Sequence, residues 1–95
     1  MVVGIGMIIF RLHDCHSLKA KRKIAKAIIA RLNNRFNVSI AETGSNDQYQ
    51  RLEIGFSMVG NDRRHINSKA DKLLNMAEDL GLAEIIDSEV EIINF

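Results

Sequence analysis

The chain has 95 residues, 46% hydrophobic and 26% charged, which predicts one globular domain over residues 1–95. Its one cysteine, Cys15, excludes an intramolecular disulfide and fits a reducing compartment, so we expect a cytoplasmic protein. The longest apolar run, near Val2–Phe10, is too short to span a bilayer, and the first residues lack the basic region of a signal peptide. We therefore expect no membrane partner.

The net charge of +1 conceals two segments of opposite sign. Residues 18–36 hold seven Lys and Arg and no acid, whereas residues 70–95 hold seven acids and one lysine. Local fields, rather than the total, decide which partners such a molecule attracts. The segment 18–36 is therefore the candidate for contact with an anion.

Residues 2–12 are predicted to form a strand that is apolar on both faces, as is typical in the centre of a sheet. Gly4 and Gly6 share one face, where a neighbouring element could approach closely. After a polar loop at 13–16, the helical period predicts a helix over 18–34. Its apolar positions are Leu18, Ala25, Ile28, Ile29, Leu32 and Phe36.

The next strand, over residues 37–43, places Glu42 on the same face as Phe36, Val38 and Ile40. A carboxylate on a core-facing position requires a partner. Lys21 lies beside the apolar stripe of the helix over 18–34, from which its long side chain could reach the sheet. We therefore predict a structural polar pair between Lys21 and Glu42.

Turn-forming residues at 44–47 indicate a hairpin that leads into an alternating strand over 51–59. A second helix begins after Asp62 and ends at Gly81. The last strand, over 85–95, is predicted to place Ile86, Val90 and Ile92 toward the core.

The resulting order, β-α-β-β-α-β, predicts an α+β ferredoxin-like sandwich: a four-stranded antiparallel sheet with two helices on one face. The first and third strands should be central. Because the first strand is apolar on both faces, we predict a homodimer that buries the open face of the sheet.

The start of the first helix points to a phosphate site. Ser17 is a good N-cap, but the turns after it carry cations where helix electrostatics prefer acids. Free backbone N–H groups together with cationic side chains can bind a phosphate there. Four of these cations share one face of the predicted helix and are called here the basic ridge: Lys19, Arg22, Lys23 and Lys26. The candidate set for nucleic-acid or phosphate binding is Ser17, Lys19, Lys21, Arg22, Lys23, Lys26, Arg63 and Arg64.

Other chemistry has weaker support. The loop His13-Asp14-Cys15-His16 lacks the second ligand pair of a structural zinc site, so we predict no metal. Cys15 has no oriented base and third group that would make it a nucleophile. A phosphatase of the acylphosphatase kind shares the element order, yet its phosphate loop is rich in glycine and this loop has none.

Several motifs together resemble the YlxP-like family, a bacterial family of unknown function. They are His13, then Ser17-Leu18-Lys19-x-Lys21-Arg22, Arg35-Phe36-Asn37-Val38-Ser39-x-Ala41-Glu42, Asp47-x-x-Gln50 and Val59-Gly60-Asn61. Tyr49 stands where the family pattern has Trp. The resemblance implies a ferredoxin-like domain, often encoded beside translation initiation and ribosome-binding factors, and it brings no catalytic residues.

The residues and the resemblance together favour a non-enzymatic accessory factor, without cofactor, that binds RNA or the small ribosomal subunit and assists its maturation. One alternative is a small-molecule sensor, with its ligand at the dimer interface or beside Glu42 and Gln50. The other is a phosphate-processing enzyme of acylphosphatase-like fold.

Overall fold

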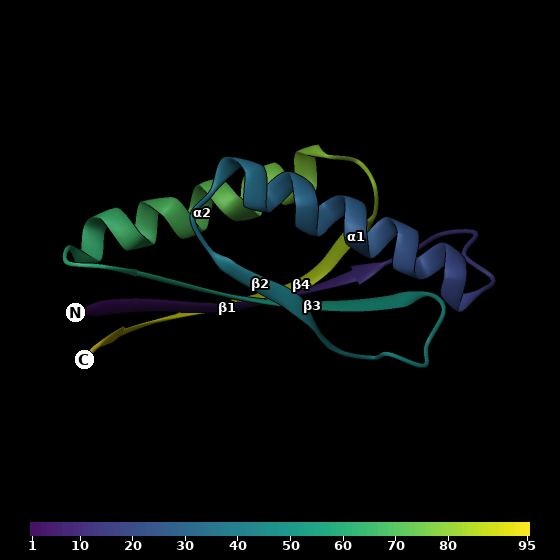
Figure 1. The fold of residues 1–95 in the computed structure, drawn as a ribbon, viewed down its shortest axis with the longest axis horizontal. Coiled ribbons are helices and arrows are strands. Elements are labelled where there is room, and N and C mark those ends of the chain that lie inside the picture. Colours follow the sequence, from purple (N-terminus) through teal and green to yellow (C-terminus); the bar gives the residue numbers. More distant parts are fainter.

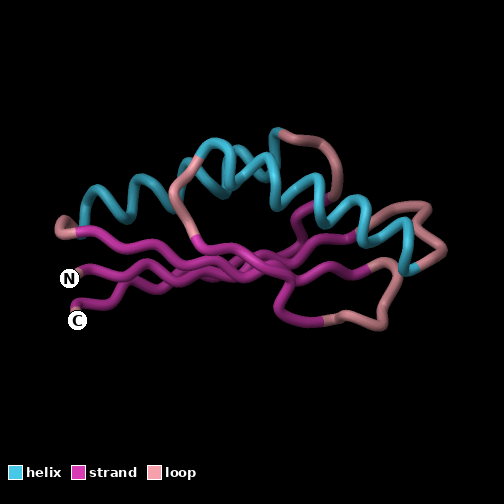
Figure 2. The backbone as a smooth tube through the Cα atoms, viewed as in Figure 1, coloured by secondary structure: helices cyan, strands magenta, loops and turns pink.

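The computed structural model describes residues 1–95 as one sheet with both helices on the same face (Figures 1 and 2). The elements are β1 (Val2–Arg11), α1 (Leu18–Arg35), β2 (Ser39–Gly44), β3 (Arg51–Gly60), α2 (Arg63–Asp79) and β4 (Glu84–Asn94). The sheet is antiparallel in the order β2-β3-β1-β4, so β1 and β3 are central. The predicted ferredoxin-like sandwich is confirmed.

The helices begin at the predicted capping residues. Ser17 Oγ accepts a hydrogen bond from the Ala20 backbone N–H at 3.1 Å, and the Asp62 carboxylate accepts one from the Arg64 N–H at 3.0 Å. After α2, Gly81 adopts φ 65°, the left-handed conformation that glycine tolerates best. Neither helix is both long and apolar enough to cross a membrane.

The core lies between the helices and the sheet. Ile8 and Phe10 of β1 and Ile54 of β3 are fully buried there, packed in one cluster with residues from both helices. Gly6 faces the same layer, where a Cβ atom would lie 2.1 Å from Phe56 Cζ. The absence of a side chain at Gly6 therefore makes room for the Phe56 ring.

The prediction that Ile86 faces the core is wrong. The register between β1 and β4 shifts between Ile9 and Phe10. Ile9 is paired with Asp87 and Phe10 with Ile85, so Ile86 is left without a partner in the ladder. A bulge of this kind inserts one residue and reverses the alternation beyond it. Ile85 consequently packs against the core cluster, whereas Ile86 is exposed.

The open face of the sheet changes character along its length. At the end near the chain termini, Val3 is paired with Val59 on one side and with Ile93 on the other, and both neighbours are exposed. Ile5, on the same face, is 44% exposed. At the other end, Arg11 is paired with Arg51. The open face thus has an apolar end and a cationic end, and the register places the acids Glu53, Asp87, Glu89 and Glu91 between them.

Candidate functional site

The basic ridge lies on the solvent-facing side of α1. All four of its side chains are exposed, and together they border a depression of about 340 Å³. None of them forms an ion pair or a side-chain hydrogen bond, since the ion pairs of the protein involve only His13 with Glu84 and Lys21 with Glu42. The acids of the C-terminal segment therefore leave the charge of the ridge unbalanced.

Ser17 holds the first turn of α1 through its cap, and no acid lies in that turn. Cys15 is buried just before it, with its thiol 3.6 Å from the Ser17 carbonyl oxygen. The start of the helix thus combines the positive end of its dipole with Lys19, Arg22 and Lys23.

Lys21 does not belong to the phosphate-binding set. Its side chain is buried, with the residue 1% exposed, and its ammonium group donates to the Ser45 carbonyl oxygen and lies 3.8 Å from Glu42 Oε1. Asn46 donates to the same carboxylate oxygen at 3.0 Å when its amide is oriented to satisfy both of its ends. The predicted Lys21–Glu42 pair is confirmed, and it ties the start of α1 to the hairpin between β2 and β3.

Arg63 and Arg64 also lie apart from the basic ridge. The two helices run in opposite directions, so α2 begins at the end of the molecule where the chain termini lie, whereas α1 begins at the other end (Figure 1). The Arg63 guanidinium donates to the Ile92 carbonyl oxygen at 3.2 Å. The fold therefore does not join these cations with the ridge in one site.

The loop at 13–16 sends its side chains to different surroundings. His13 Nε2 lies 2.7 Å from Glu84 Oε2 on β4, and both side chains are largely exposed. His16 instead borders a cavity together with Cys15. The two histidines thus do not converge on one site.

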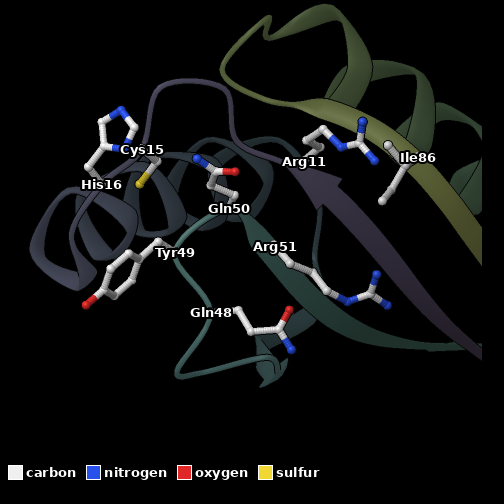
Figure 3. Close-up of a pocket in the computed structure, with 8 residues that line it drawn as sticks. All are labelled: Arg11, Cys15, His16, Gln48, Tyr49, Gln50, Arg51 and Ile86. Atoms are coloured by element: carbon white, nitrogen blue, oxygen red, sulfur yellow. The ribbon is translucent and has the colours of Figure 1, made fainter.

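This cavity, called here the loop cavity, measures about 660 Å³ and lies where the loops at 12–17 and 45–50 meet the ends of the strands. Figure 3 shows Cys15, His16 and Tyr49 at one end, with the Tyr49 ring directed outward, and Arg11, Arg51 and Ile86 at the other. Gln48 and Gln50 complete the lining. No acidic residue lines it. Ile86 reaches the cavity because the bulge turns it away from the core.

Sequence reasoning missed the arginine pair, Arg11 and Arg51, which the register of β1 and β3 places directly opposite each other. Side chains opposite each other in an antiparallel ladder have Cβ atoms about 5 Å apart, and like charges there are destabilising. Both residues fall at positions whose side chains alternate toward the open face, at the ends of the two central strands nearest the loops. This pattern could have revealed the pair from the sequence.

Solved structures resemble the fold at low sequence identity. The de novo designed protein Foldit4 aligns over 100% of this chain and 99% of its own, with a TM-score of 0.57 and 14% identity. The de novo designed protein LFR1 1, described as having a ferredoxin fold, aligns over 98% of this chain and 83% of its own, with a TM-score of 0.53 and 12% identity. At such identities these likenesses concern the fold alone.

Sequence comparison identifies the relatives. An uncharacterized protein, YlxP of Bacillus subtilis (strain 168), is 38% identical over 63 residues, which cover 66% of this chain and 68% of that protein. The model of the family described as "Protein of unknown function (DUF503)" matches residues 3–90. The match extends over nearly the whole sandwich, and the chain therefore belongs to the DUF503 family, in agreement with its resemblance to YlxP-like proteins.

Proposed function

We propose that the protein is a non-enzymatic RNA-binding accessory factor, in which the basic ridge on α1 contacts the phosphate backbone. The proposal extends to a partner on the small ribosomal subunit or its precursor and to a cytoplasmic location, which the single free cysteine favours. It assigns no catalytic residue and no cofactor.

The observation that carries the proposal is the unbalanced charge of the ridge. Lys19, Arg22, Lys23 and Lys26 are spaced so that they are neighbours on the helix surface, where like charges repel unless an anion lies between them. Exposed helices ordinarily relieve such repulsion with acids at neighbouring positions, and α1 contains none. A line of phosphates supplies the missing charge from outside.

Duplex RNA suits the ridge better than a single strand does. The ridge contains no aromatic side chain on which a base could stack. Double-stranded RNA presents continuous phosphate rows, which proteins recognise through backbone contacts and shape. The depression between the four side chains is lined by these cations alone, which suits the charge of a phosphate backbone.

The experiment compares two variants that each lose four positive charges. In the ridge variant, Lys19, Arg22, Lys23 and Lys26 become Gln. In the matched control, Arg31, Arg35, Arg63 and Arg64 become Gln, which changes the net charge equally at other exposed positions of the helices. Binding of a blunt RNA hairpin is measured by fluorescence anisotropy over a range of salt concentrations.

We expect the ridge variant to lose its affinity for the RNA hairpin and the control variant to retain most of that affinity. For the wild type, neutralisation of about four phosphates predicts a slope of log K against log salt of about −3 to −4. Equal losses in both variants would show that net charge, not the ridge, governs binding. An affinity that does not depend on salt would refute backbone contact altogether.

We further propose that the apolar end of the open face mediates a homodimer. Val59 and Ile93 are 63% and 38% exposed there, beside Val3 and Ile5. Contiguous exposed apolar side chains on a sheet are typical of interfaces. A C2 dimer would bury this patch against its own copy.

The oligomeric state tests this proposal directly. Light scattering at micromolar concentration should give twice the chain mass of 10.7 kDa for the wild type and one chain mass for Ile5→Asp. A monomeric wild type would remove the homodimer without affecting the RNA proposal.

A further inference from the structure

We infer that the loop cavity binds one unpaired nucleotide of the RNA, with its phosphate on the arginine pair and its base against Tyr49. The inference rests on the proposed function, because it treats the cavity and the basic ridge as two parts of one RNA surface. The ridge holds the duplex backbone, and the cavity accepts a nucleotide that leaves the duplex.

The positive charge of the arginine pair is not offset by an ion pair within the protein. Glu84 is paired with Arg11 in the ladder, but its carboxylate contacts His13 instead. Glu53, one step further along the open face, accepts a hydrogen bond from Thr43 Oγ1 at 2.8 Å. Neither arginine forms an ion pair.

Arg51 is held in position with its terminal nitrogen atoms free. Its Nε donates to Ser45 Oγ at 3.1 Å, which fixes the side chain without using the two terminal amino groups. Guanidinium groups bind phosphate oxygens in a bidentate manner, so the terminal nitrogen atoms of Arg51 can bind a phosphate, and Arg11 on the neighbouring strand adds positive charge.

The remaining lining suits a base. Tyr49 is 49% exposed, and aromatic rings at such positions stack on bases with little sequence preference. Gln48 and Gln50 also line the cavity and carry amides that can donate to and accept from base edges (Figure 3).

The cavity adjoins the start of the helix that carries the ridge. His16 borders the cavity, and Lys19, the first ridge residue, follows it within one turn of the start of α1. One RNA can therefore pass from the ridge to the cavity around the cap at Ser17. An RNA duplex with one bulged nucleotide fits both surfaces, because the duplex backbone contacts the ridge and the bulged nucleotide enters the cavity.

Fluorescence can report on the cavity selectively. The protein has no Trp and Tyr49 is its only Tyr, so Tyr49→Trp introduces a single indole fluorophore that is excited outside nucleotide absorption. The indole keeps an aromatic face for stacking. The Tyr49→Trp variant is titrated with a blunt RNA hairpin, with the same hairpin carrying one bulged nucleotide, and with free AMP.

We expect the bulged hairpin to quench the indole fluorescence of the Tyr49→Trp variant. It should also bind about tenfold more tightly than the blunt hairpin, which corresponds to the binding free energy gained by stacking one base on an aromatic side chain. Tyr49→Ala should abolish that tenfold advantage, and so should Arg11→Gln combined with Arg51→Gln. Both variants should lose more affinity for the bulged hairpin than for the blunt hairpin. AMP should quench only at much higher concentrations, because it lacks the ridge contacts.

The outcomes separate this inference from the proposed function. Binding of both hairpins with equal affinity and without quenching would overturn the cavity inference and leave the ridge proposal standing. If Tyr49→Trp combined with the four ridge changes to Gln binds both hairpins as tightly as Tyr49→Trp alone, and the bulged hairpin still quenches it, the cavity inference stands and the ridge proposal is refuted. Saturation by AMP at lower concentrations than by the bulged hairpin would overturn the assignment to RNA, and the cavity would be a free-nucleotide site.

Discussion

The Lys21–Glu42 pair makes a quantitative prediction about stability. Glu42→Gln removes the negative partner of an ammonium group on a residue that is 1% exposed. At the Nζ–Oε1 separation of 3.8 Å, an effective dielectric constant of about 20 gives an attraction of about 4 kcal/mol. The Glu42 side chain is 25% exposed and the Ser45 carbonyl oxygen still accepts from Lys21, so part of this attraction is screened or replaced.

We therefore expect Glu42→Gln to lower the free energy of unfolding by about 2–3 kcal/mol, at or just below the roughly 3–5 kcal/mol that breaking a fully buried ion pair costs. For a domain of this size the loss corresponds to a fall in Tm of about 10–20 °C. Lys21→Met combined with Glu42→Gln should be more stable than Glu42→Gln alone, because no buried charge is then left without its partner.

The assay is urea unfolding followed by circular dichroism for the wild type, both single variants and the double variant. Lys19→Met is the matched control, since it removes an exposed lysine from the same turn of α1 and should change stability by less than about 0.5 kcal/mol. A loss below about 0.5 kcal/mol for Glu42→Gln, or a coupling energy near zero in the double-mutant cycle, would refute the reasoning.

Three further outcomes are expected. Gly6→Ala places a Cβ 2.1 Å from Phe56 Cζ and should lower the free energy of unfolding, measured with denaturant, by about 1–3 kcal/mol. If adding Phe56→Leu does not restore stability, overpacking is not the cause of the loss. Ser17→Ala should lose about 1 kcal/mol while Ser17→Asp keeps the cap, and equal stability of the two variants would contradict the capping role. Lys26→Gln should leave stability within about 0.5 kcal/mol and make the salt slope for duplex RNA shallower by about 0.7–0.9, whereas an unchanged slope would place Lys26 outside the interface.

The sequence by itself determined the element order, the caps and the faces that form the core. These features follow from local periodicity and from the residues at chain reversals, which act over a few positions. Even the Lys21–Glu42 pair could be predicted, because each residue occupies an apolar face where a charge needs a partner. The basic ridge was likewise readable, since it lies within one helix.

Only the tertiary structure decided which cations lie near one another. Arg63 and Arg64 share the sequence pattern of the ridge, but the antiparallel run of the helices places them at the opposite end of the molecule. Arg11 and Arg51 lie forty positions apart in the sequence and are brought together by the register of β1 and β3. Register and bulges depend on pairing between distant strands, and so the bulge that turns Ile86 into the loop cavity has no local signal either.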